Sequence, residues 1–425
     1  MLEDTGPYFV SFGSRLEKPS YLELNFYYGG NIGDDPERRW RVVVVPAFAG
    51  ELFHYSGNFT TQNFGLRNAY AETENLLTKG LRLWAGSRMY RGDDVYLFDF
   101  WPLDNLNTVG GGLGYRFNRE RTDLAFQIGM NRLSNLFQYQ EIQVPSRSLP
   151  PDSVILSPQG ATSTALMLDR PRVVSSLKLT HFLRNTSVLP NAKAILYAEF
   201  HYLPSGQRQT TAVMEQSPLQ LPQDFGWVVG GQLGGWLRPF VFANVFLRTA
   251  GGLAAYGDLG QPYGFDQNLQ VTKALDVIAA FSLNWESQAL GIMGGGYVHR
   301  FRDAGAGDNR GFDEGALAVR PQVYLNRYVH LAVELSYQLR APSTVDQNTG
   351  AYLKPQVFRA SLMPIVAPLG RGTYSRPFLY AIYTLSLLNS DAQYTLFNPG
   401  DIRGGKTDVH YLGLGVEWWF NSSYR

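Results

Sequence analysis

Apolar and polar residues alternate with a period of two along most of the chain, in segments of about ten residues. In one segment Phe126, Ile128 and Met130 share a face, whereas Gln127 lies on the other. The alternation recurs in residues 21–28, 275–286, 329–338 and 412–420. This period is typical of β-strands, whose side chains point alternately to opposite faces. The pattern therefore predicts an all-β chain.

The length of the alternating segments favours a membrane-spanning sheet. Globular strands average about five to six residues, whereas a tilted strand needs about 9 to 11 to cross a hydrocarbon core. Aromatic residues stand at the ends of several apolar faces, where membrane barrels have their interfacial girdles of aromatic side chains. These residues are Tyr28, Trp285, Tyr337 and Phe420. Backbone polar groups in lipid must pair within the protein, which a closed sheet achieves. We predict one transmembrane antiparallel β-barrel over residues 1–425, as a single domain.

The predicted connections alternate in length, as short turns and long outer loops do in outer-membrane barrels. The long candidates are residues 29–39, 139–170, 204–222, 303–315 and 389–407. Residues 68–77 are compatible with a short helix, but the flanking strands favour a strand there too.

Composition excludes several other classes. Charged residues make up 17% of the chain, below the ~25% typical of soluble domains, and aromatic residues make up 14%. The longest apolar run, residues 42–50, is too short for a membrane helix and contains Pro46. The 37 basic and 36 acidic residues nearly cancel, which argues against a nucleic-acid partner. The absence of cysteine excludes disulfides and thiol catalysis.

The sequence predicts no enzyme. Its six histidines lack the spacing of a zinc helix, and no nucleophile elbow, P-loop or dinucleotide fingerprint is present. We expect no cofactor and no bound metal. Met1 is followed by Leu2, Glu3 and Asp4 rather than by a basic and then an apolar region. We therefore expect a mature chain whose signal peptide has been replaced by a start methionine.

Several aromatic residues fall on the polar faces of predicted strands, where lipid contact does not account for them. These are Tyr21, Phe240, Phe242, Tyr374 and Trp419. Each could simply fill the barrel interior. A row of rings beside Glu23, Arg376 and Glu417 would also suit a sugar, which has an apolar ring face and a rim of hydroxyls.

Two stretches resemble maltoporin, the sugar-specific porin family of the bacterial outer membrane. The first is the run LWAGSRMY at residues 83–90, followed by Asp94-Val95, Asp99-Phe100-Trp101 and the glycines at 110–112. The second combines YSRP at residues 374–377 with GVEWWF at residues 415–420. The sequence YLEL at residues 21–24 adds a match near the start.

The resemblance implies an eighteen-stranded barrel in a homotrimer, located in the bacterial outer membrane and surrounded by its lipid. It implies a third loop, residues 91–114, that folds inward to narrow the channel. It also implies passive diffusion of oligosaccharides of the maltodextrin kind along an aromatic slide. The matching slide positions are Tyr8, Tyr21, Phe59, Phe240, Tyr374 and Trp419. Those of the constriction and polar tracks are Trp101, Asp94, Asp99, Arg91, Glu23, Arg15, Arg67, Arg376 and Glu417.

The chain departs from the family pattern at specific points. Gly92 stands where the family has a constriction arginine, and Tyr374 replaces a tryptophan. Residues 421–425 follow Phe420, where the family chain ends, and are either a natural extension or an added segment. These departures leave the sugar and its chain length open.

Three alternatives remain at this stage. A general or other-solute porin would conduct ions without block by any oligosaccharide, and Gly92 favours it. A secretion channel for an acidic polysaccharide would need a basic lumen, against which Glu23, Glu286, Glu334 and Glu417 argue. A lipid-hydrolysing barrel would need a nucleophile near the outer girdle.

Overall fold

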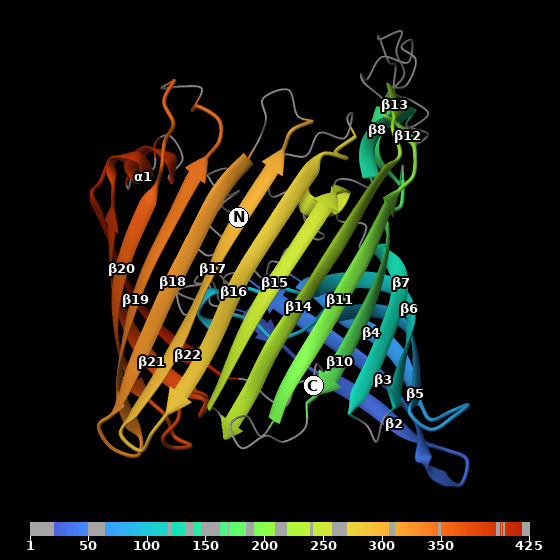
Figure 1. Cartoon of the computed structure of the whole chain (residues 1–425), viewed down its shortest axis with the longest axis horizontal. Coiled ribbons are helices and arrows are strands. Elements are labelled where there is room, and N and C mark those ends of the chain that lie inside the picture. Colours follow the sequence, from blue (N-terminus) through green and yellow to red (C-terminus); the bar gives the residue numbers. More distant parts are fainter. Residues whose placement is uncertain are drawn as a thin grey trace, which may run out of the picture.

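Antiparallel strands form one large sheet that curves around a central opening (Figure 1). The computed structural model describes residues 21–49, 64–117, 121–131, 139–145, 162–168, 170–183, 191–208, 219–238, 241–256, 270–305, 311–346, 350–396, 400, 402 and 404–418. None of the helices in these ranges is long and apolar enough to cross a membrane.

The elements of the large sheet follow one another around the wall. The first are β1 (Tyr21–Glu23), β2 (Phe26–Ile32), β3 (Asp35–Ala49), β4 (Phe64–Glu74), β5 (Leu81–Arg91), β6 (Asn105–Phe117) and β7 (Thr122–Asn131). The next are β10 (Val173–Phe182), β11 (Asn191–Leu203), β14 (Asp224–Arg238), β15 (Val241–Gly252), β16 (Ala274–Glu286) and β17 (Leu290–Asp303). The last are β18 (Gly311–Tyr324), β19 (Val329–Pro342), β20 (Gln356–Val366), β21 (Phe378–Leu388) and β22 (Asp408–Glu417).

Sequential antiparallel pairing confirms the predicted eighteen-stranded, all-β architecture. Two of its segments, β1 and β2, lie end to end along β3, with Tyr21 opposite Ala49 and Phe26 opposite Val44. They form one edge of the sheet and β22 forms the other. Within the described ranges, these two edges are not paired with each other.

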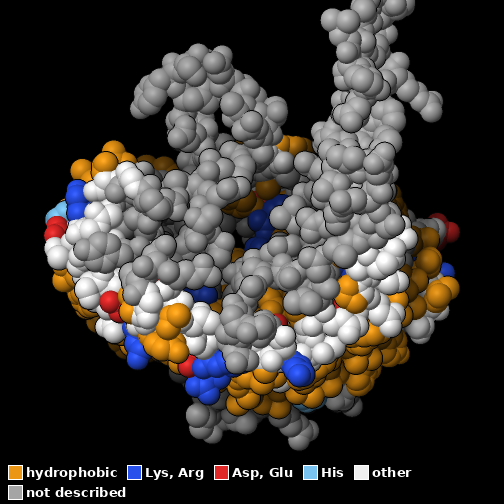
Figure 2. Space-filling model, turned by 90° about the horizontal axis from the view of Figure 1, so that it is seen from above, with side chains coloured by type: hydrophobic (Ala, Val, Ile, Leu, Met, Phe, Trp, Pro, Cys, Tyr) orange, Lys and Arg blue, Asp and Glu red, His pale blue; other side chains and the backbone are white. Residues whose placement is uncertain are grey.

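Side chains alternate between the interior and the outer surface as the sequence predicts. On β7, Gln127 is 2% exposed, whereas its neighbour Ile128 is 49% exposed. On β15, Phe246 is buried and Leu247 is exposed. Hydrophobic side chains cover much of the outer wall visible in Figure 2. An apolar outer surface around an interior that holds many polar side chains is the arrangement expected of a sheet surrounded by lipid.

Most long connections lie at one rim of the sheet, the upper one in Figure 1, and the short turns at the other. The connection between β20 and β21, residues 367–377, is an exception, because Ala367 bonds to Tyr328 in the short turn between β18 and β19. Two long connections contain hairpins of their own, β8 (Tyr139–Pro145) with β9 (Thr162–Leu168), and β12 (Gly206–Arg208) with β13 (Leu219–Leu221). The connection after β21 contains α1 (Ser390–Thr395). The alternation of loop lengths inferred from the sequence is therefore present.

The long loop predicted at residues 29–39 is wrong. Strands β2 and β3 pair through this region and are joined by a tight turn, with Gly29 opposite Arg41 and Gly30 opposite Trp40. Gly33 adopts a φ of 66°, a left-handed conformation that glycine adopts without strain. The loop expected at residues 303–315 is also shorter, because β18 already begins at Gly311.

Candidate functional site

The connection between β5 and β6, residues 92–104, folds into the interior of the sheet. Its side chains Val95, Leu97, Phe98 and Leu103 are almost fully buried. They pack against inward-facing residues of β11 and β14–β18: Ile195, Tyr197, Val228, Phe246, Ala250, Ile278, Ala280, Met293, Tyr297, Ala316 and Ala318. The predicted inward-folded third loop is therefore present. Its last ten predicted residues, 105–114, belong to β6 instead.

A short turn shapes the tip of this β5–β6 loop. The 3₁₀ turn η2 (Tyr96–Phe98) is closed by a bridge between Val95 and Phe100, whose backbone groups bond at 2.7 Å. Asp99 ends the turn in the left-handed region, with φ 54°, which aspartate tolerates better than most side chains. The turn aims Tyr96 and Phe98 away from β5 toward the opposite wall.

Four aromatic rings form a continuous row from the wall to the loop tip. Trp236 on β14 contacts Phe242 on β15, with ring centroids 4.9 Å apart. Phe242 contacts Tyr374 at 6.1 Å, and Tyr374 contacts Tyr96 at 5.5 Å. Such spacings are typical of favourable aromatic pairs, and the rings present flat apolar faces in series.

The loop tip is tied to the sheet edge by a charged pair. Arg376 Nε donates to Glu417 Oε2 at 2.8 Å, and its Nη2 donates to the Tyr96 hydroxyl oxygen at 2.7 Å. The Tyr96 hydroxyl in turn donates to Glu417 Oε1 at 2.5 Å. Arg376 and Glu417, both predicted site residues, are thus brought together at the end of the aromatic row.

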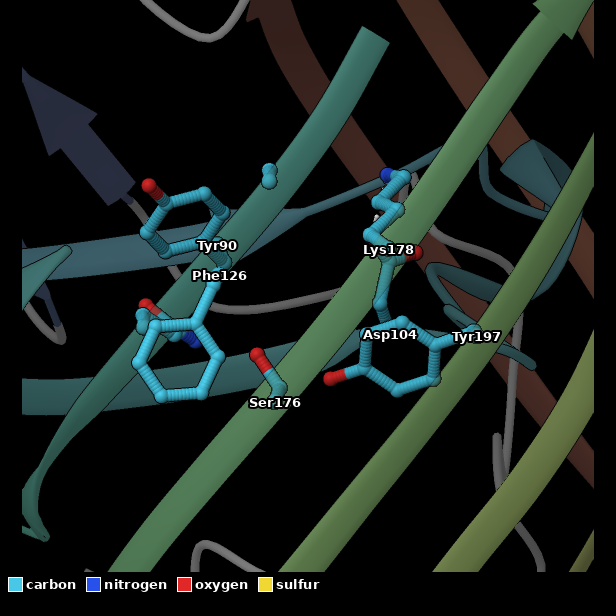
Figure 3. Close-up of a pocket in the computed structure, with 8 residues that line it drawn as sticks. Tyr90, Asp104, Phe126, Ser176, Lys178 and Tyr197 are labelled. Atoms are coloured by element: carbon cyan, nitrogen blue, oxygen red, sulfur yellow. Dashed lines mark hydrogen bonds and ion pairs between the residues drawn. The ribbon is translucent and has the colours of Figure 1, made fainter. Parts of the chain in front are cut away.

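The two ends of the loop are held by ion pairs to the neighbouring strands. Asp93 accepts from Lys193 of β11 at 2.6 Å and also contacts Gln232. Asp104 accepts from Lys178 of β10 at 2.5 Å, and Tyr90 and Tyr197 line the same small pocket (Figure 3). Burial alone would raise the pKa of the Asp93 carboxyl, but the Lys193 ammonium lowers it below its ordinary value.

Close packing explains why residue 92 is glycine. A Cβ atom built at Gly92 would lie 2.1 Å from Oδ1 of Asp104, well inside van der Waals contact. A side chain at the position where the resembled family has an arginine would therefore have to displace the Asp104 carboxylate, which is paired with Lys178. The charged contact next to it is instead the pair between Asp104 and Lys178.

Other predicted residues form two further groups. Arg91 lies over the ring of Trp101, with Cζ 3.9 Å from the centroid, a cation–π geometry. Near the edge of the sheet, the hydroxyl of Tyr21 donates to Glu23 at 2.5 Å and accepts from Arg67 at 2.5 Å. Tyr21, which the sequence predicts as a slide residue, is thus adjacent to two residues predicted for the polar track.

Not all predicted site residues can be placed. Asp94 and Asp99 lie in the inward loop, beside buried Val95 and at the end of η2. The slide and track positions outside the described residues are Tyr8, Arg15, Phe59, Phe240 and Trp419.

One placement was wrong. Tyr374 and Arg376 do not lie on a strand face, as their alternation had indicated, but in the connection that precedes β21.

Sequence reasoning missed Tyr96, Asp93 and the two lysines that hold the loop. One local signal for Tyr96 was present, since residues 95–98 are a run of four apolar residues inside a connection. Such a run favours burial against a partner surface, which an inward loop provides. The lysines carry no such signal, because only the fold brings them to their partners. Lys178, for example, lies 74 positions from Asp104 in the chain.

The comparison with protein families agrees with this architecture. The model of the LamB porin family matches residues 9–420, nearly the whole chain. The chain belongs to the LamB porin family. Membership confirms the resemblance to maltoporin and makes the protein a member of a family of outer-membrane β-barrel channels rather than of enzymes. No curated protein sequence matches the chain.

Solved outer-membrane proteins show distant likeness. OmpT of Vibrio cholerae, folded in vitro, is 10% identical over 93% of this chain and 95% of its own, with a TM-score of 0.34. The same protein expressed in the outer membrane is 10% identical over 92% and 90%, with a TM-score of 0.32. Wzi of Escherichia coli, a carbohydrate-binding β-barrel involved in capsule assembly, is 10% identical over 88% and 81%, with a TM-score of 0.28.

Proposed function

We propose that this LamB-family porin is a channel for passive, carbohydrate-selective diffusion of oligosaccharides of the maltodextrin kind across the outer membrane. The observation that carries the proposal is the row of rings formed by Trp236, Phe242, Tyr374 and Tyr96. The row ends at the pair of Arg376 and Glu417, so apolar faces and charged hydrogen-bonding groups adjoin along one path.

The proposed mechanism is downhill movement between shallow binding positions. The apolar face of a sugar ring lies against one aromatic ring after another, while its hydroxyls exchange hydrogen bonds with the flanking guanidinium and carboxylate groups. Each contact must be weak enough to release the sugar, as conduction through a pore with several sites requires. No covalent step is involved.

The slide and track residues outside the described ranges belong to this proposal through the family resemblance. Tyr8, Phe59, Phe240 and Trp419 extend the row of rings, and Arg15 extends the polar track. A homotrimer completes the proposal, since the position of Phe59 matches a slide residue that reaches over from a neighbouring subunit.

The proposal is tested by sugar block of single-channel current in a planar bilayer. Tyr374→Ala and Tyr21→Ala each remove one ring, and we expect block by maltotriose to weaken about three- to tenfold with ion conductance nearly unchanged. Trp285→Ala serves as the control, because Trp285 is an outward-facing aromatic on the neighbouring wall. Equal block in the unaltered protein and all three variants would show that neither the row, represented by Tyr374, nor Tyr21 lies on the sugar path.

A porin without sugar specificity is the second candidate. The observation that favours it is Gly92, where the family's constriction arginine has no counterpart. Such a channel would carry a current that no oligosaccharide in the series reduces.

A further inference from the structure

The β5–β6 loop divides the interior unequally. Its apolar side chains occupy the side bounded by β14–β18. On the other side, a cavity of about 670 Å³ is lined by β2–β7 and β10. Lys and Arg side chains are visible within the central opening in Figure 2.

The lining of this cavity is strongly basic. Seven cationic side chains line it, against three carboxylates, Glu72, Glu74 and Asp123. The cations are Lys178 and the arginines Arg39, Arg41, Arg82, Arg88, Arg91 and Arg116. When Asp104, the partner of Lys178, is counted as well, seven cations against four carboxylates leave three positive charges around a concave space, where field lines concentrate and attract anions. The whole chain, by contrast, has a formal charge of only +1.

The glutamates that had argued against a basic lumen lie elsewhere. Glu334 is paired with Arg320 at 2.5 Å, and Glu417 is paired with Arg376. Glu286 accepts from the backbone N–H of Thr373, and Glu23 lies near Arg67 at the sheet edge. None of the four lines the cavity. The sequence alternation placed them on the inner face correctly but did not show on which side of the loop.

The cationic side chains are held in position before any solute arrives. Glu72 accepts from Arg41 at 2.7 Å and from Arg88 at 2.6 Å. The guanidinium of Arg88 also lies over Tyr70 and Tyr90, at 4.5 and 4.7 Å from their ring centroids. Arg116 bridges Glu74 and Asp123 at 3.3 and 3.2 Å. Because Glu72 holds two guanidinium groups in place, these side chains lose little further conformational freedom when a solute binds.

Glycines on β6 keep the cavity open. A Cβ at Gly112 would lie 2.4 Å from Nε1 of Trp84, and one at Gly114 would lie 2.9 Å from Nη2 of Arg82. Without side chains at these two positions, Trp84 and Arg82 can lie against the wall rather than project into the space.

We propose that this cavity binds the acidic group, a carboxylate, phosphate or sulfate, of anionic oligosaccharides, which the channel passes in addition to neutral ones. The inference rests on the proposed function, to which it adds an acidic class of saccharide. Guanidinium groups bind such oxyanions through paired, charge-assisted hydrogen bonds. The cavity also contains Tyr27, Trp40, Tyr70 and Tyr90, which supply ring contacts for the sugar itself.

The test compares block by trigalacturonate with block by maltotriose in planar bilayers at 0.1 M and 1 M KCl. We expect trigalacturonate to block at about tenfold lower concentration at 0.1 M KCl. The advantage should shrink at 1 M KCl, where the screening length falls to ~3 Å. A KCl gradient should also give a reversal potential on the chloride-selective side.

Two variants and a matched control connect the effect to the cavity. Arg41→Gln and Arg116→Gln remove side chains that are 41% and 40% exposed. Glu72 keeps Arg88 when Arg41 is replaced, and Asp123 keeps Arg82 when Arg116 is replaced. Glu74 loses its ion pair with Arg116. We expect each change to reduce the ratio of trigalacturonate to maltotriose block about threefold or more. Arg300→Gln removes an outward-facing, salt-bridged arginine and should leave the ratio unchanged.

The outcomes separate this inference from the function on which it rests. Equal block by the two saccharides at 0.1 M KCl, or an unchanged ratio in both cavity variants, would overturn the acidic-saccharide inference and leave the sugar channel intact. Absence of block by either saccharide would overturn both. Equimolar inorganic phosphate that abolishes the whole advantage of trigalacturonate would show a site for free anions instead.

Discussion

The hydroxyl of Tyr96 donates to Oε1 of Glu417 at 2.5 Å, although the two residues are 321 positions apart in the chain. This contact joins the tip of the inward loop to the last strand of the sheet. With Arg376 bonded to both groups, it forms a closed triangle of polar contacts. The loop is therefore fixed at its tip as well as at its two ends.

Tyr96→Phe removes the hydroxyl from this triangle while leaving the ring contact with Tyr374 possible. We expect the pair of Arg376 and Glu417 to persist and the loop tip to move more. The single-channel current should become noisier in the open state. Tyr115→Phe is the control, because Tyr115 stacks on Phe117 on the outer surface. Equal noise in the two variants would contradict the anchoring role.

Trp101→Ala removes the ring beneath the guanidinium of Arg91. Because Trp101 lies in the inward loop, we expect a wider passage and a higher ion conductance than in the unaltered channel. The measurement is single-channel conductance in 1 M KCl. A conductance equal to that of the unaltered channel would show that Trp101 does not narrow the pore.

Phe98→Ala creates a cavity where the loop packs on the wall, since Phe98 is 1% exposed and its ring lies 5.7 Å from that of Tyr297. We expect loop docking to lose about 3–5 kcal/mol, the usual cost of a buried Phe→Ala change. Limited proteolysis of the folded protein in detergent should then cleave within residues 92–104. Leu77→Ala, in an exposed turn, should cause no new cleavage.

The ion pair of Asp93 and Lys193 predicts how the loop responds to acid. The pKa of Asp93 is lowered from its ordinary value of about 3.9, so the stabilisation is complete above about pH 4. It is lost as the pH falls through the lowered folded-state value. Conductance should therefore be constant from pH 7 to pH 5 and rise only in stronger acid. Asp93→Asn should show the acid conductance already at pH 7; a rise near pH 6 in the unaltered protein would contradict this origin.

The regular part of the fold could be predicted from sequence because each strand meets the same two environments. Ile128 faces outward and Gln127 inward as the alternation requires, and the same holds for Leu335 and Glu334 on β19. Where a strand does not have one apolar and one polar face, as at the end of β2, the alternation gave a wrong prediction. The pattern predicts Gly29 and Gly30 in a loop, yet they pair with β3, where glycine fits close to Trp40 and Arg41.

The candidate site could be predicted only in part, because it depends on the path of the inward loop. The sequence named Arg376 and Glu417 as site residues without predicting that they pair, and their proposed role in sugar passage stays a prediction. The resemblance could not identify Tyr96 as the partner of Tyr374 or the basic cavity beside the loop. Both arise from which side of the interior the apolar run at residues 95–98 occupies, and the sequence does not record that choice.

The central claim is tested most directly by single-channel recordings of the unaltered chain with maltose, maltotriose and longer malto-oligosaccharides at millimolar concentrations. The account predicts closing in three steps, with block that saturates and strengthens with oligosaccharide length. A large open current that none of the saccharides, neutral or acidic, reduces would contradict it.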